Sequence, residues 1–116
     1  MPEHRRHKRV PLAALAKISF VDAGNVYTVK TFTADISMSG IGVYSEIAID
    51  MDKDVTLAIE FLGNDGLSKT DSIGGHVVYN YILGTAFFIG IEFSEQINQF
   101  RQPFLYERVQ RILAWG

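Results

Sequence analysis

The sequence has 116 residues, of which 47% are hydrophobic, a formal net charge of −2 and no cysteine. That length and hydrophobic content suit one domain around a single core, and the absence of cysteine excludes a disulfide framework and a thiolate metal site. No window reaches the roughly 18 consecutive apolar residues of a membrane-spanning helix, and the first residues lack the apolar run of a signal peptide. We therefore expect a cytoplasmic protein that does not insert into a membrane.

The basic residues gather at the N-terminus. Arg5, Arg6, Lys8 and Arg9 make residues 1–9 net positive, so the rest of the chain is more acidic than the total charge suggests. Duplex nucleic acid needs many phosphate contacts spread over a broad basic face, which an acidic body does not offer. This distribution disfavours duplex nucleic acid as a partner and favours a small anion held by a basic arm.

Alternation of apolar and polar residues predicts six short strands after the arm. The first two form a hairpin in which Gly24 and Asn25 are available for positive φ. Six strands with brief connections predict an all-β antiparallel barrel or sandwich. The expected strands occupy residues 15–22, 26–33, 41–46, 55–62, 70–80 and 84–93.

After Phe93 the apolar residues recur every three or four positions, which is typical of a helix with one buried stripe. We expect this helix over about residues 95–115, with Pro103 interrupting or restarting it, because proline is tolerated in a first turn but not in a helix interior. Trp115 is expected to complete the buried stripe, and the alternative is an exposed anchor for a partner. The other members of that stripe are Ile97, Phe100, Phe104, Leu105, Val109, Ile112 and Leu113.

The stretch "RRHKR" carries the first group of candidate binding residues. Arg5 and Arg9 have an Arg-x-x-x-Arg spacing, with Arg6 between them. A guanidinium offers a planar fork of donors that can grip a phosphate or a guanine edge with two hydrogen bonds. On its own, such a cluster near a terminus is more often a solvated tail.

The stretch "DISMSG", residues 35–40, carries the second group. Asp35 can accept hydrogen bonds from N1 and N2 of a guanine, and Ser37 can bond a phosphate or cap a turn. Gly40 permits positive φ or the close approach of a ligand. On its own, this pattern is more often a structural turn.

Together, and in this order, the two stretches resemble the signature of the PilZ domain family, RxxxR followed by [DN]xSxxG before a barrel strand. The resemblance continues through "GTAFFIGIEF" to the terminal helix. It implies a single PilZ-like domain over residues 1–116, with a flexible basic arm at 1–12, a six-stranded antiparallel β-barrel at about 13–93 and a C-terminal helix at about 95–115. It also implies binding of cyclic di-GMP, a bacterial second messenger, by Arg5, Arg6, Arg9, Asp35, Ser37 and Gly40.

We therefore expect a bacterial receptor without enzymatic activity, whose loose arm closes over cyclic di-GMP and relays the signal to an unidentified effector protein. No nucleophile-elbow, P-loop or metal-binding spacing occurs, and the cations around His4 and His7 repel a metal, so we expect neither a metal nor a cofactor. Two alternatives stay open: an interaction adaptor of the same fold without ligand binding, and a small β-barrel that binds RNA or single-stranded DNA. Monomer and homodimer are equally compatible with the sequence.

Overall fold

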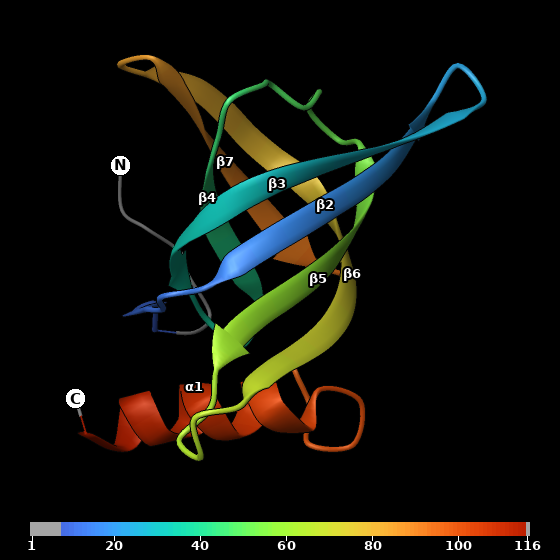
Figure 1. Ribbon diagram of the computed structural model, residues 1–116. Coiled ribbons are helices and arrows are strands. Elements are labelled where there is room, and N and C mark those ends of the chain that lie inside the picture. Colours follow the sequence, from blue (N-terminus) through green and yellow to red (C-terminus); the bar gives the residue numbers. More distant parts are fainter. Residues whose placement is uncertain (1–7, 116) are drawn as a thin grey trace.

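The computed structural model describes residues 8–115, in which seven antiparallel strands are followed by one helix (Figure 1). No helix within this range is long and apolar enough to cross a membrane. The strands are β1 (Val10–Pro11), β2 (Leu15–Asp22), β3 (Asn25–Ile36), β4 (Gly40–Ser45), β5 (Asp54–Leu62), β6 (Ser68–Leu83) and β7 (Ala86–Phe93), and the helix is α1 (Pro103–Trp115).

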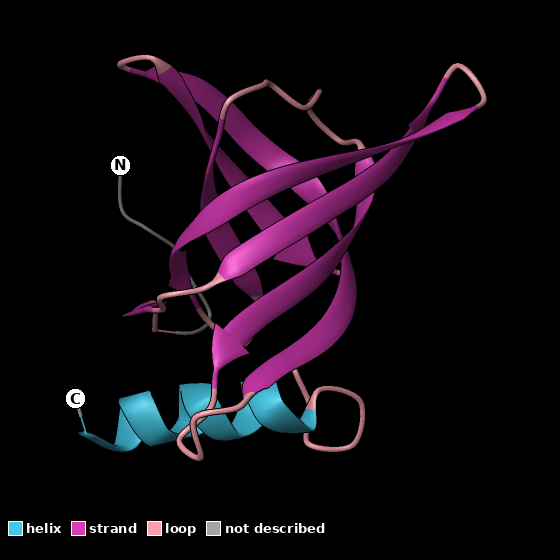
Figure 2. Cartoon of the chain, viewed as in Figure 1, coloured by secondary structure: helices cyan, strands magenta, loops and turns pink. Residues whose placement is uncertain are grey.

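Six of these strands close into a ring. The sheet order is β1-β3-β2-β5-β6-β7-β4, and an additional pairing between β3 and β4 joins its two sides. The short β1 lies outside the ring, beside the last two residues of β3. Figure 2 shows strands around the ring and the helix across one end, with two hairpins extending at the other end. The predicted six-stranded, all-β fold with a C-terminal helix is confirmed.

The core fills the ring, because alternate residues of each strand point inward. In β5 the predicted face is buried: Val55, Leu57, Ile59 and Phe61 are each 5% exposed or less. Most other core residues are isoleucine or valine, whose branched side chains pack well on a pleated surface. Burial of each contributes about 1.5–3 kcal/mol, so the alternating pattern fixes the register of the strands.

The hairpin between β2 and β3 turns one residue earlier than expected. Asp22 pairs with Asn25, which leaves Ala23 and Gly24 as a two-residue turn with φ of 50° and 81°. The prediction was right for Gly24 and wrong for Asn25, which lies in β3. Positive φ at both central positions is typical of a type I′ turn, whose twist matches that of the strands, so Ala23 adopts a conformation that usually favours glycine.

The helix begins at Pro103, not near residue 95. Asn98 closes a turn before it, since its side-chain Oδ1 accepts hydrogen bonds from the backbone N–H groups of Phe100 and Arg101 at 3.0 and 2.9 Å. Proline has no N–H to donate and therefore occupies the first helical position. Of the predicted stripe, Ile97, Leu105 and Val109 are buried, whereas Phe100, Phe104 and Trp115 are exposed.

Asp71 of β6 holds the N-terminus of α1 against the ring. Its Oδ2 accepts a hydrogen bond from the backbone N–H of Leu105 at 2.7 Å. The first N–H groups of a helix have no partner within the helix, and a carboxylate there also complements the helix dipole. Gln102 adds a second tie, because its Nε2 donates to the carbonyl of Ser72 at 3.1 Å.

The substitution Asp71→Asn tests this cap through the pH dependence of stability. Burial raises the pKa of Asp71 above its ordinary value, so the folded protein holds this proton more tightly than the unfolded chain does. The group's contribution to the free energy of unfolding therefore falls as the pH rises from the unfolded pKa through the folded one. Asparagine keeps an oxygen acceptor and does not ionise, so we expect Asp71→Asn to gain stability relative to the wild type across that window.

Urea titrations at about pH 3 and about pH 7 measure the free energy of unfolding on both sides of the window. The control Asp71→Ala loses the acceptor and should be less stable than the wild type by about 1–2 kcal/mol at both pH values. An equal difference between Asp71→Asn and the wild type at both pH values would contradict a raised pKa of Asp71 in the folded state.

Candidate functional site

The pairing of β1 with β3 brings the two candidate stretches together. Val10 pairs with Ile36 and Pro11 pairs with Asp35. Val10 and Leu12 are each 4% exposed, so residues 10–12 belong to the folded body and not to a flexible arm as predicted. The physical reason is the burial of two apolar side chains, worth about 1.5–3 kcal/mol each. Arg9, next to the inward-facing Val10, points to the outer surface.

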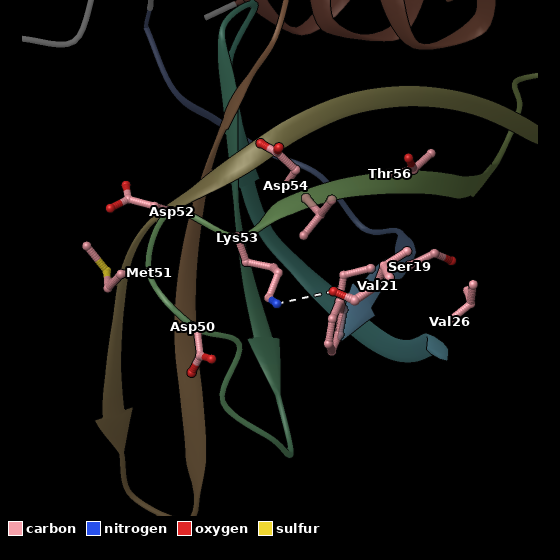
Figure 3. A pocket seen from close by; sticks show the side chains of 11 residues that line it. Ser19, Val21, Val26, Asp50, Met51, Asp52, Lys53, Asp54 and Thr56 are labelled. Carbon is pink, nitrogen blue, oxygen red and sulfur yellow. Dashed lines mark hydrogen bonds between the residues drawn. The ribbon is translucent and has the colours of Figure 1, made fainter. Parts of the chain in front are cut away.

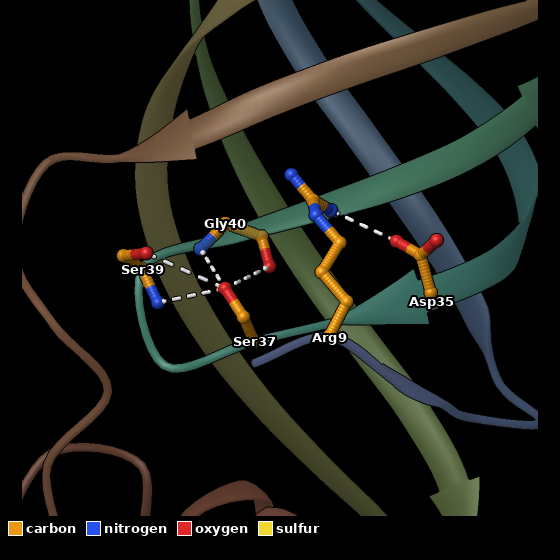
Figure 4. A network of polar contacts seen from close by, with 5 residues as sticks. All are labelled: Arg9, Asp35, Ser37, Ser39 and Gly40. Atoms are coloured by element: carbon orange, nitrogen blue, oxygen red, sulfur yellow. Dashed lines mark hydrogen bonds and ion pairs between the residues drawn. The ribbon is translucent and has the colours of Figure 1, made fainter. Parts of the chain in front are cut away.

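Arg9 and Asp35 form an ion pair on that outer surface (Figure 4). Arg9 Nη1 donates to Asp35 Oδ1 at 2.8 Å, and the two side chains are 15% and 34% exposed. Arg9 Nε is buried and has no acceptor among the residues that the structure describes. The guanidinium is thus held in position by one strong contact, while much of its hydrogen-bonding capacity is not used by that contact.

A β-bulge makes this contact possible. The register between β3 and β4 shifts between Thr33 and Asp35. Phe32 is exposed before the shift and Ile36 is fully buried after it, so the alternation of inward and outward positions is reversed. A bulge inserts one unpaired residue and re-aims the side chains that follow. Without it, Asp35 would face the core.

Ser37 holds the turn that follows β3. Its Oγ accepts hydrogen bonds from the backbone N–H groups of Ser39 and Gly40, both at 3.1 Å, and its side chain is almost fully buried. The Ser37 N–H donates to the carbonyl of Gly40 at 2.8 Å. These bonds satisfy the turn from within. Of the two roles predicted for Ser37, the geometry corresponds to the turn cap.

Gly40 is required by the close approach of β7. A Cβ at this position would lie 2.7 Å from the carbonyl oxygen of Ile91 and 3.6 Å from Arg9 Nη2. Its φ is not among the positive values, which excludes one of the two reasons given from the sequence. The glycine keeps the turn close to its neighbouring strand and leaves room for the Arg9 side chain above it.

The sequence analysis did not identify Met38 as part of the site. Met38 stands between Ser37 and Ser39 in the sequence. Its side chain is 8% exposed, and its carbonyl accepts a hydrogen bond from the N–H of Ile97 at 2.9 Å. Gln110 of α1 lies against its sulfur, with Nε2 3.6 Å from Sδ. An apolar residue between polar ones in "DISMSG" was the available signal. Met38 connects the turn to the segment before α1 and to α1 itself.

Arg5 and Arg6 of the predicted binding set lie outside the described residues, as do His4 and His7. Within residues 8–115, no three histidine, aspartate or glutamate side chains gather as metal ligands would. The structure therefore brings together Arg9, Asp35, Ser37 and Gly40 of the six predicted positions.

A broad open pocket lies away from this site, near the end of the ring that α1 does not cover (Figure 3). Asp50, Asp52 and Asp54 contribute to its lining, and Lys53 donates to the carbonyl of Val21 at 3.2 Å. Lys53 also pairs with Asp22 at 3.5 Å. With its cation engaged and three carboxylates around it, this pocket does not suit an anionic ligand.

Comparison with solved structures shows the same fold in three proteins. Each is 16% identical to this chain and covers 97% of it. They are the inhibitor of motility MotI/DgrA from Bacillus subtilis (TM-score 0.70), the PilZ domain of YcgR from Escherichia coli with c-di-GMP (0.61), and MrkH from K. pneumonia in complex with c-di-GMP (0.65).

The chain spans 93% of the YcgR domain but only 53% of the MotI/DgrA chain and 54% of the MrkH chain. No curated protein sequence matches it. The model of the PilZ domain matches residues 3–103, which include both candidate stretches and all seven strands. The chain therefore belongs to the PilZ domain family.

Proposed function

We propose that this protein is a receptor for cyclic di-GMP and that it passes the signal to an effector protein without catalysing a reaction. The observation that carries the proposal is the Arg9–Asp35 ion pair, which joins the two signature stretches on the outer surface of the ring. Two of the solved structures with this fold, the YcgR domain and MrkH, were determined with c-di-GMP. Family membership and the donor set of the site support the same ligand.

The chemistry of the ligand suits this pair. Cyclic di-GMP is a dianion with two guanine bases, so it needs cationic forks for its phosphates and a carboxylate for a guanine N1–N2 edge. In the proposed complex, Arg9 binds the ligand with the donors that Asp35 does not use, and Asp35 accepts from a guanine. Arg5 and Arg6 add cations that close over the ligand. Ser37 and Gly40 act by shaping the turn and leaving space.

Met38 suggests how binding reaches a partner. The turn that Ser37 caps directly follows Asp35, and its Met38 lies against Gln110 of α1. A ligand that draws Arg9 and Asp35 together with residues of the arm alters the surface beside α1. An effector that prefers one of the two arrangements then reads the occupancy of the site.

Isothermal titration calorimetry of cyclic di-GMP at near-physiological salt, with GTP and GMP as controls, tests this function directly. We expect saturable binding of the cyclic dinucleotide and much weaker binding of the two mononucleotides. Equal binding of any polyanion, weakening steeply with salt, would instead favour the single-stranded nucleic-acid alternative. The absence of binding would leave the adaptor alternative.

The substitution Arg9→Ala should weaken binding of cyclic di-GMP by roughly tenfold to a hundredfold, since a hydrogen bond to a charged group contributes about 1.5–3 kcal/mol. Circular dichroism should show the ring intact, because the Arg9 side chain lies outside the core. The matched control is Arg101→Ala, which removes an arginine from an exposed ion pair with Glu95. Arg101→Ala should bind like the wild type, and equal losses in both variants would contradict a specific role for Arg9.

The substitution Asp35→Ala should reduce both affinity and selectivity for guanine, because it removes the acceptor for the N1–N2 edge. Selectivity is measured as the ratio of the dissociation constants of cyclic di-AMP and cyclic di-GMP. Asp22→Ala, which breaks the exposed pair with Lys53, serves as the control. Wild-type affinity in Asp35→Ala would show that the carboxylate does not bind the ligand.

A further inference from the structure

Aromatic side chains gather on the outer face of the ring next to Asp35. Tyr44 of β4 pairs with Phe88 of β7, and Phe88 pairs with Tyr81 of β6. Tyr44 and Tyr81 are 41% and 51% exposed, whereas the intervening inward positions Val43 and Ile89 are fully buried. Tyr79 lies one row further along, opposite Gly90. We call these four residues, Tyr44, Tyr79, Tyr81 and Phe88, the aromatic platform.

A second β-bulge puts the tyrosines of β6 on this face. The register with β7 shifts between Val77 and Tyr79. Val77 is fully buried, and regular alternation would direct Tyr79 and Tyr81 into the core as well. After the shift, Asn80 pairs with the buried Ile89, while Tyr79 and Tyr81 lie on the outside. The bulge thus acts on β6 as the first bulge acts on β3 at Asp35.

Two glycines let the rings lie flat against the sheet. A Cβ at Gly90 would overlap the ring of Tyr79, and a Cβ at Gly42 would lie 2.8 Å from Cζ of Phe88. Both rings therefore occupy space that a side chain on the neighbouring strand would fill. Each ring therefore covers the backbone of a glycine on a neighbouring strand.

The rings of the platform contact one another. Tyr79 lies 5.8 Å from Phe88 and 5.9 Å from Tyr81, with interplanar angles of 23° and 22°. Tyr44 and Tyr81 lie 5.2 and 5.6 Å from Phe88 at steeper angles. Aromatic covering of glycines stabilises sheets and accounts for Tyr79 and Phe88. It does not account for Tyr44 and Tyr81, which enlarge the aromatic area while staying exposed.

The platform begins where the proposed ligand site ends. The Cβ position at Gly42 that lies 2.8 Å from the Phe88 ring lies 3.1 Å from Asp35 Oδ1. The carboxylate and the aromatic edge therefore meet over a single glycine. Within the described residues, an aromatic surface thus continues directly from the Arg9–Asp35 pair.

We propose that the aromatic platform is a stacking site for a guanine of cyclic di-GMP, an inference that rests on the proposed function. Every nucleobase has a π-face that stacks on aromatic side chains, and each stacked base adds substantially to affinity. Arg9 and Asp35 bind the charged and polar edges of the ligand, and only the planar guanidinium of Arg9 offers a face to a base. The platform supplies an aromatic face beside them, and Tyr44 and Tyr81 determine how much of it a purine covers.

The substitutions Tyr81→Leu and Tyr44→Leu test the platform without removing the rings that cover the glycines. Each should weaken binding of cyclic di-GMP by about fivefold or more in calorimetry. In proton NMR, the guanine H8 signal should move upfield on binding to the wild type, because of ring currents, and less on binding to either variant. Tyr81→Phe keeps the ring and should bind like the wild type.

The matched control is Tyr27→Leu. Tyr27 is also a strand tyrosine, 46% exposed and stacked on a neighbouring ring, that of Phe20 at 5.7 Å, but it lies near the β2–β3 hairpin turn. It should bind with wild-type affinity. Equal weakening in Tyr27→Leu and Tyr81→Leu would overturn the stacking site, as would a loss of affinity in Tyr81→Phe.

The outcomes separate this inference from the proposed function. If the wild type binds cyclic di-GMP and Tyr44→Leu and Tyr81→Leu bind equally well, the stacking site is wrong, the receptor function stands, and the platform is left for a protein partner. If the wild type does not bind cyclic di-GMP, both proposals fail. Selective weakening in Tyr44→Leu and Tyr81→Leu, with the H8 shift reduced, supports both.

Discussion

The two β-bulges in β3 and β6 decide which side chains meet on the outside of the ring. Each inserts one residue and reverses the alternation of a long strand, so that Asp35 on one strand and Tyr79 with Tyr81 on the other leave the core. The strands between them, β4 and β7, contribute glycines at the facing outward positions. A charged pair and an aromatic surface come to lie side by side because both reversals occur on the same face of one closed sheet.

The turn after β3 makes two kinds of contact, one within its own backbone and one with α1. Its buried serine binds only the turn's own backbone, and its methionine packs toward α1, so the turn is a rigid link between the outer surface and the helix. Asp71 and Gln102 hold the start of that helix to β6 independently. In the proposed relay, a change at the Arg9–Asp35 pair would act on a helix whose beginning is held to β6 by Asp71 and Gln102.

Much of the fold follows from the alternation of apolar residues along β2, β5 and β7, because side chains that point into the ring must be apolar. The predicted strand 15–22 has the same bounds as β2, and Ala16 and Ile18 are its buried residues. The pairing of Arg9 with Asp35 depends on β1, a strand of two residues with no periodicity to detect, and on a bulge that no local pattern marks. The exposed Phe100 and Trp115 continue the helical spacing, but Phe100 precedes the helix and Trp115 ends it beyond the ring. The spacing of apolar residues alone does not show where α1 stops contacting the end of the ring.

The two glycines beneath the aromatic rings link the evolution of several positions. A side chain at Gly90 has no room unless Tyr79 becomes smaller, and Gly42 stands in the same relation to Phe88. Among relatives that share this surface, each glycine and its covering ring should therefore change together. Tyr44 and Tyr81 cover no glycine, so a change at either does not require a change at a glycine. A lineage that lost its ligand would be expected to lose these exposed rings first, while the two covered glycines, which the sheet itself needs, would persist.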